Sequence, residues 1–174
     1  GCGGEAGGGG VVAEGEGGGG VGGFLYWQSH SDGKRAAEGD KYAAAFKALG
    51  ENKPQLAETS LKELAESNTD GFSASARFTQ ATLLLQKNDL KGAAALMGAI
   101  AADTKVPQEF RDLALIRQTM VEYDTIKPDV VIARLGGLAV KDSAWYGSAG
   151  EMLAGAYLRQ GKRAQAGKLY GEIA

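Results

Sequence analysis

The side chains that most often carry chemistry are sparse in this chain of 174 residues. It has one histidine, His30, and one cysteine, Cys2, and neither has neighbours at the spacing that a histidine-based triad or a zinc site needs. Glu151 and Glu172 are too isolated to predict paired-carboxylate catalysis, which needs a pocket that separates their pKa values. The sequence therefore predicts no catalytic residue, no metal site, no cofactor and no enzymatic activity.

The overall charge also excludes one class of partner. Lys and Arg number 19 against 21 Asp and Glu, which gives a net charge of −2. A nucleic-acid partner would require basic clusters on one face, and none is visible. We therefore expect protein partners and no nucleic acid.

The first 23 residues differ sharply in composition from the rest. They carry 14 of the 28 glycines, whereas residues 34–174 resemble an ordinary Ala-rich helical protein. Each glycine costs a helix about 1 kcal/mol relative to alanine, so the run taken literally is a flexible segment. An expression scar or a disordered linker is one interpretation of it.

A membrane anchor is the interpretation that we favour. The run is followed by Phe24, Leu25, Tyr26 and Trp27, and aromatic residues of this kind gather at membrane–water interfaces. Residues 5–27 as a helix would extend roughly 35 Å, enough to cross a hydrocarbon core of about 30 Å. We predict that residues 1–30 form a single transmembrane helix, in which many glycines stand for side chains that were not identified. The aromatic run could instead be a core staple against the first repeat.

Apolar residues recur at helical spacing through the remaining chain. Gly50 predicts a helix stop, Pro54 and Pro128 predict helix starts, and Asp89 can cap a helix after the break at Asn88. The predicted helices begin near Lys34, Pro54, Phe72, Asp89, Gln108, Pro128, Trp145 and Arg163. The apolar residues predicted to face inward include Leu56, Leu61, Leu64, Phe110, Ile116, Met120 and Val121.

An internal repeat predicts how these helices are arranged. Two segments match at a spacing of 73 residues, about two units of a 34-residue helix–turn–helix repeat. The matched pairs are Ala93 with Ala166, Leu96 with Leu169, Ile100 with Ile173, and Ala101 with Ala174. Small residues occupy equivalent places in the four second helices, at Ala57, Ala93, Val131 and Ala166, and again at Ala65, Ala101, Ala139 and Ala174. Such residues let helices lie close together.

The last helix pair matches the tetratricopeptide consensus. Counted from Gly147, consensus positions 8, 11, 15, 20 and 24 are Ala154, Tyr157, Gly161, Ala166 and Tyr170. The third pair, with a long loop at 124–127, matches poorly. We predict an all-α fold: a tetratricopeptide-like α-solenoid of about four antiparallel helix pairs over residues 34–174, preceded by the transmembrane helix.

Several short segments resemble one bacterial family. Gly23 to Ser29, Asp103 to Pro107, Arg111 to Ala114 and Gly150 to Ala154 are similar to the membrane-anchored tetratricopeptide-like proteins related to YfgM, especially their alphaproteobacterial branch. The resemblance implies one inner-membrane helix, a periplasmic repeat domain, and an accessory role beside the Sec translocon among periplasmic chaperones. Members of that family continue past the point that matches Ala174, so we expect the chain to be truncated there.

The first helix of each tetratricopeptide pair lines the concave surface. This rule predicts a partner-binding groove whose residues are Ser75, Phe78, Thr82, Leu85, Gln86, Ser148, Glu151, Leu158 and Arg159. Alternatively, Phe78, Leu85 and Leu158 belong to the core and the others are solvated surface. The predicted function is a membrane-anchored protein-interaction module, a chaperone adaptor at the translocon. The alternative is a structural accessory subunit of another inner-membrane complex.

Overall fold

The computed structural model describes residues 18–67 and 70–174, and it describes side chains from residue 32 onward except at 68–70. The chain divides into two units, residues 1–37 and 38–174. Every regular element in the described part of the chain is an α-helix. The fold prediction is therefore confirmed as all-helical.

The first helix, α1 (Gly18–Gly50), belongs to both units. It begins well before Lys34, the start that the sequence predicts, and glycine's helical propensity does not account for this extension. Among the described residues, no helix combines the length and the apolar character needed to cross a membrane. Residues 1–17 of the predicted anchor, and the side chains of Phe24 to Trp27, lie outside what the structure describes.

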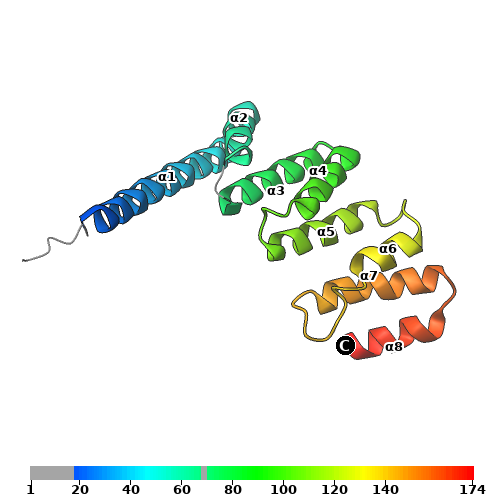
Figure 1. Ribbon diagram of the computed structural model, residues 1–174. Coiled ribbons are helices and arrows are strands. Elements are labelled where there is room, and N and C mark those ends of the chain that lie inside the picture. The colour runs from blue at the N-terminus through cyan, green and yellow to red at the C-terminus, as the bar shows by residue number, and fades with distance from the viewer. Residues whose placement is uncertain (1–17, 68–69) are drawn as a thin grey trace, which may run out of the picture. The chain divides into compact units, whose positions relative to one another are not determined.

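Seven further helices follow in the second unit, and Figure 1 shows them stacked as successive hairpins. They are α2 (Pro54–Ala65), α3 (Asp70–Gln86), α4 (Leu90–Ala102), α5 (Gln108–Glu122), α6 (Pro128–Leu135), α7 (Tyr146–Arg159) and α8 (Arg163–Ile173). Consecutive helices from α2 to α8 pack against one another. This arrangement of antiparallel pairs agrees with the predicted repeats.

Three of the four first helices end in the same way. Asn52, Asn88 and Gly161 have φ values of 59°, 60° and 75°, the left-handed conformation that ends a helix. At each end, two backbone N–H groups donate to carbonyls three and five residues earlier, as in Asn88 to Leu85 (2.9 Å) and Asp89 to Leu84 (2.8 Å). This pair of bonds is the Schellman motif, and it recurs at the ends of α1, α3 and α7.

The start of α4 confirms a predicted cap. Asp89 Oδ1 accepts a hydrogen bond of 2.8 Å from the backbone N–H of Gly92. Pro54 and Pro128 each begin a helix as predicted. The paired glycines 136–137 follow α6 directly, so that helix is short.

The predicted small-residue positions form the centre of the stack. Ala57, Ala93, Val131 and Ala166 all have fully buried side chains, so this equivalence is confirmed. Buried residues of α1 to α7 form three clusters, one of which joins Phe78, Ile100 and Ala114 across α3, α4 and α5. In the second set, Ala65, Ala101 and Ala139 are partly buried, whereas Ala174 is exposed.

Two predicted inward residues face outward. The side chains of Leu56 and Met120 are each 59% exposed, so these predictions are wrong. In α5 the buried position next to Met120 is taken by Thr119, which is fully buried. Its hydroxyl donates to the carbonyl of Leu115 at 2.8 Å, so this polar side chain is satisfied inside the core and Met120 turns toward solvent.

Candidate binding groove

The predicted groove residues of α3 do gather at one cavity. Ser75, Phe78, Thr82 and Gln86 all line a groove with a volume of about 650 Å³. Leu85, the fifth residue predicted on this helix, is half-buried and does not line it. The alternative assignment of Phe78 also holds in part, because its ring is only 8% exposed and belongs to the core while one face lines the groove.

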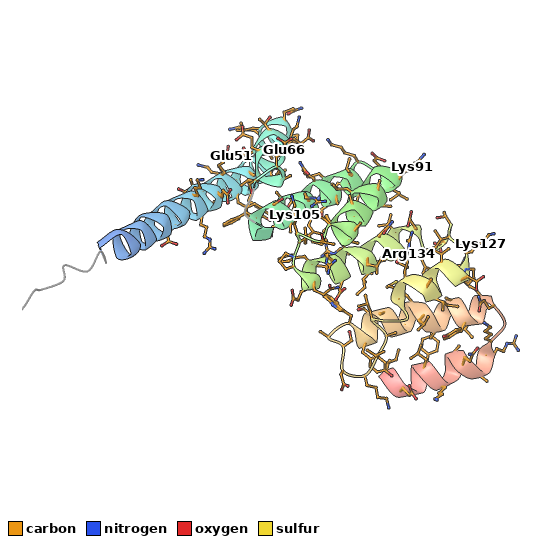
Figure 2. All side chains as sticks on the ribbon, viewed as in Figure 1. Glu51, Glu66, Lys91, Lys105, Lys127 and Arg134 are labelled. Atoms are coloured by element: carbon orange, nitrogen blue, oxygen red, sulfur yellow. The ribbon has the colours of Figure 1, made fainter. Side chains whose placement is uncertain are left out.

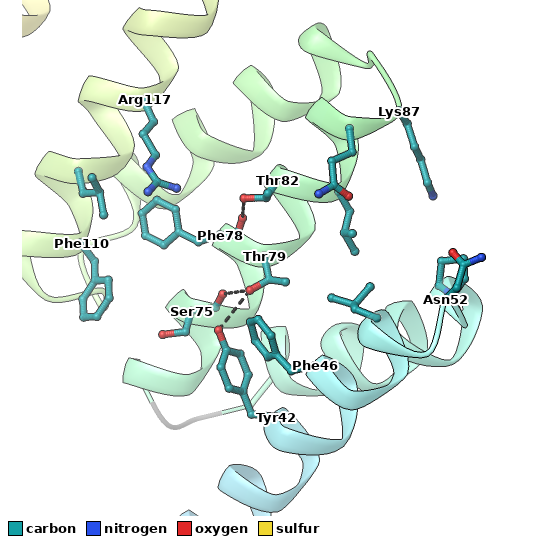
Figure 3. Close-up of a pocket in the computed structure, with 15 residues that line it drawn as sticks. Tyr42, Phe46, Asn52, Ser75, Phe78, Thr79, Thr82, Lys87, Phe110 and Arg117 are labelled. Atoms are coloured by element: carbon teal, nitrogen blue, oxygen red, sulfur yellow. Dashed lines mark hydrogen bonds between the residues drawn. The ribbon is translucent and has the colours of Figure 1, made fainter.

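Two more first helices complete the walls, as Figure 3 shows. The remaining lining residues are Tyr42, Phe46 and Leu49 of α1, Asn52 and Pro54 after it, Thr79, Leu83 and Lys87 on α3 and just after it, and Phe110, Leu113 and Arg117 of α5. The groove is therefore formed by the first helices of three successive pairs, which is where a tetratricopeptide-like repeat places its concave surface.

The repeat in the sequence also indicates the α5 residues that line the groove. A shift of 35 residues places Ser75, Phe78 and Thr82 on Phe110, Leu113 and Arg117. Both triplets line the groove. The residues predicted from the consensus positions belong to the second and fourth pairs, so that prediction does not include the equivalent residues of the third pair.

Four of the fifteen residues that line the groove are aromatic, and Phe46 is the most exposed of them. Phe46 is 48% exposed, and its ring centroid lies 4.9 Å from that of Tyr42. The rings of Phe78 and Phe110 are 6.2 Å apart in a tilted arrangement. Exposed aromatic rings in a concave site are the side chains that most often anchor a protein partner.

Three of the four hydroxyl groups that line the groove, those of Tyr42, Thr79 and Thr82, are hydrogen-bonded within its walls. Thr79 and Thr82 donate to the carbonyls of Ser75 and Phe78, each at 3.0 Å. Because the Thr79 proton is used in that bond, the Tyr42 hydroxyl is the donor in the 3.2 Å bond between Tyr42 and Thr79. These bonds fix the positions of α1 and α3, and they leave the Ser75 hydroxyl and the side-chain amides of Asn52 and Gln86 available to a partner.

The charged side chains of the groove are both cationic, since no Asp or Glu is among its lining residues. Lys87 forms an ion pair with Glu58 of α2. The guanidinium carbon of Arg117 lies 5.6 Å from the centroid of the Phe78 ring. Within the part of the chain whose side chains are described, no carboxylate pairs with Arg117.

The predicted residues of α7 do not join this groove. Ser148 and Glu151 are exposed, and Leu158 is 48% exposed rather than core. Arg159 is engaged within the protein: its Nη1 and Nη2 atoms donate to the carbonyls of Tyr123 and Ile126 at 2.7 and 2.8 Å. The structure thus places Arg159 as a cap on the end of α5.

A close approach of α7 supports this cap. The Tyr123 hydroxyl donates to the carbonyl of Met152 at 3.0 Å, and burial raises the pKa of this hydroxyl, so it stays protonated. A Cβ atom at Gly155 would overlap the Tyr123 hydroxyl. The guanidinium of Arg159 lies 5.3 Å from the Tyr123 ring centroid. Tyr123, Gly155 and Arg159 form one interlock, which we call the α5–α7 interlock.

Ion pairs elsewhere fasten helices together. Arg77 of α3 bonds to Asp103 after α4 at 2.9 Å, and this hydrogen bond lowers the pKa of the Asp103 carboxyl. Arg134 of α6, labelled in Figure 2, bonds to Glu122 of α5 at 2.6 Å. In the part of the chain that the structure describes, no three His, Cys, Asp or Glu side chains are placed to hold a metal ion.

One family model matches nearly the whole chain. It is described as a tetratricopeptide repeat-like domain and covers residues 11–173. No curated protein matches the sequence, and no solved structure matches it. The match extends from the glycine-rich region to α8 and includes every helix that lines the groove.

Proposed function

Because the chain belongs to the tetratricopeptide repeat-like family, we propose that it binds a partner protein in the groove formed by α1, α3 and α5. The groove carries this proposal, because it presents the half-exposed Phe46 beside a concave surface lined by three successive repeats. Domains of this family are in general non-catalytic interaction modules, and the sequence offers no constellation of reactive side chains. The molecule accordingly acts by binding.

We further propose where this binding takes place. Residues 1–30 anchor the chain in a bacterial inner membrane, and the repeat domain lies in the periplasm as a chaperone adaptor beside the Sec translocon. Two observations support this proposal: the run Phe24 to Trp27 has the composition of a membrane interface, and the sequence resembles the proteins related to YfgM.

An accessory subunit of another inner-membrane complex is the second candidate function. It is favoured by α1, which continues N-terminal to the repeats as a helix, with residues 32–37 all exposed. A subunit of this kind would contact its complex through α1 and the first helix pair. The adaptor would contact clients through the groove.

Site-specific photo-crosslinking tests these candidates. A photoreactive phenylalanine analogue replaces Gln86 in the groove, Ala36 on α1, or Ala99 on the exposed side of α4 as the matched control. Membranes are irradiated and solubilised in detergent, and the crosslinked partners are identified by mass spectrometry.

The three positions give distinct outcomes. Translocase components or periplasmic chaperones linked from position 86 support the adaptor. Stoichiometric linkage from position 36 to another complex, with none from position 86, supports the accessory subunit. If neither position yields partners beyond those from position 99, the proposal that this protein is an interaction module is wrong.

A further inference from the structure

The charge of the groove restricts the chemistry of its occupant. Arg117 is exposed, stacks on Phe78 and has no carboxylate partner among the described side chains, and the groove lining contains no acidic residue. A carboxylate brought beside Arg117 would form a charge-assisted hydrogen bond, which is stronger than a neutral one. A cationic segment would be repelled by Arg117, whereas the charge of Lys87 is already compensated by Glu58. The complementary occupant is therefore acidic.

The hydrogen bonding of the walls restricts its conformation. All three wall elements are helices, whose backbone groups are already paired, and the hydroxyls of Thr79 and Thr82 bond to their own helix. An extended segment would leave most of its backbone N–H and C=O groups unpaired, because Asn52, Ser75 and Gln86 are the few neutral polar side chains of the groove that do not already bond to its walls. A helical segment satisfies its own backbone and needs only apolar side chains to fill the groove.

The length of the groove limits the length of the helical segment that it can bind. The lining residues of α3 and its end run from Ser75 to Lys87, which at a rise of 1.5 Å per residue is about 18 Å. A helix of the same length has about 12 residues, or three turns. Such a helix presents apolar side chains on one face at positions i, i+3 or i+4, and i+7.

We infer that the groove binds an amphipathic helix of about three turns, whose apolar face contacts Phe46, Phe78 and Phe110 and which carries an Asp or Glu beside Arg117. This inference rests on the proposed function, since it names the partner chemistry of the same groove. The side-chain amides of Asn52 and Gln86 accommodate the polar flank of that helix.

A random peptide library tests the inference without assuming a partner. Sixteen-residue peptides displayed on phage are selected against the full chain, and enriched peptides are synthesised with a fluorophore. Their dissociation constants are measured by fluorescence anisotropy with the wild type, Phe46→Ala, Arg117→Glu and the matched control Lys141→Glu. Lys141 is exposed and lies outside the groove. Circular dichroism first verifies that each variant is folded.

The expected result has three parts. Enriched peptides have apolar residues at helical spacing with Asp or Glu on a flank, and they gain helical dichroism when bound. Arg117→Glu weakens their binding by roughly three- to tenfold, because an exposed attractive pair becomes a repulsive one. Phe46→Ala weakens binding by about tenfold, and Lys141→Glu leaves it within about twofold.

Two results would overturn the proposals separately. If peptides that depend on Phe46 are basic, or bind as extended proline-rich segments, the inference fails while the groove remains a binding site. If no enriched peptide loses affinity in Phe46→Ala, the groove is not the binding surface and the proposed function itself fails.

Discussion

The turn between α3 and α4 and the turn between α5 and α6 each connect the two helices of a pair, but they are held by different contacts. At the first turn, Asn88 adopts the left-handed conformation, the two Schellman bonds close the helix, and Asp89 caps the next one. All of these contacts are local. Their residues are adjacent in the sequence, so this turn can form without its neighbours.

The second turn has no left-handed residue among its described positions. Locally, the backbone N–H groups of Thr125 and Ile126 donate to the carbonyl of Glu122 at 2.9 and 3.0 Å. Arg159 adds bonds to the carbonyls of Tyr123 and Ile126, at sequence separations of 36 and 33. A repeat can therefore end a helix without a left-handed residue when the next repeat supplies further donors. The cost is that the geometry of this turn depends on the packing of α7.

The two helix pairs differ in their turns, but we expect their buried core residues to contribute equally to stability. Ile100 in α4 and Leu135 in α6 are both fully buried, so Ile100→Ala and Leu135→Ala should each destabilise the protein by about 2–5 kcal/mol. Urea unfolding followed by circular dichroism measures both, with Leu90→Ala, at a 51% exposed position, as the control. A much smaller loss for Leu135→Ala than for Ile100→Ala would show that the two pairs also differ in their cores.

A change in the α5–α7 interlock should show the difference between the two turns most clearly. Arg159→Ala removes two charge-assisted hydrogen bonds to carbonyls and should cost about 1–2 kcal/mol. Hydrogen exchange should accelerate at residues 123–127 and stay unchanged at residues 87–89. Arg163→Ala, at an exposed arginine of α8, is the control. Equal acceleration at both turns would contradict a specific contribution of Arg159 to the α5–α6 turn.

The local turn should respond to a local change. Asp89→Ala removes the cap of α4 and should cost about 1 kcal/mol, whereas Asp89→Asn should retain most of it. Thermal unfolding gives both values. Asp124→Ala, at the exposed corresponding loop of the third pair, should have almost no effect. Should Asp124→Ala prove as costly as Asp89→Ala, the second turn would depend on a local side-chain cap as the first one does.

The smallest effect concerns pH at the end of the α3–α4 pair. Arg77 lowers the pKa of the Asp103 carboxyl, so this pair stabilises the fold above the unfolded pKa of about 3.9 and ceases to do so as the pH falls through the lower folded pKa. The difference in urea midpoint between the wild type and Asp103→Asn should therefore shrink between pH 6 and pH 3. A difference that stays constant with pH would exclude this origin.

Repeat periodicity made much of the fold predictable. Ala57, Ala93, Val131 and Ala166 were aligned from the sequence because close helix packing admits only small side chains there, and all four are buried. Proline and Asp89 marked helix starts for equally local reasons. The groove residues of α3 followed from the consensus, and those of α5 would have followed from the same periodicity.

The rest depended on details that apolar periodicity and consensus position do not contain. Apolar periodicity placed Met120 inside, but the neighbouring Thr119 can satisfy its hydroxyl on its own helix and takes the buried position. Consensus position alone assigned Arg159 to a binding surface, and only the path of the loop after α5 reveals the carbonyls that it binds. No local pattern encodes either choice.

Gly155 restricts which substitutions this protein can accept during evolution. Its missing side chain admits the Tyr123 hydroxyl, and the same tyrosine presents the ring and the carbonyl that Arg159 holds. A side chain at position 155 would displace the Tyr123 hydroxyl, whereas the backbone carbonyls that Arg159 binds are present whatever residue stands at position 123. In related chains Tyr123 and Gly155 should therefore be replaced together or kept together, so that they leave a covariation signal across more than 30 residues.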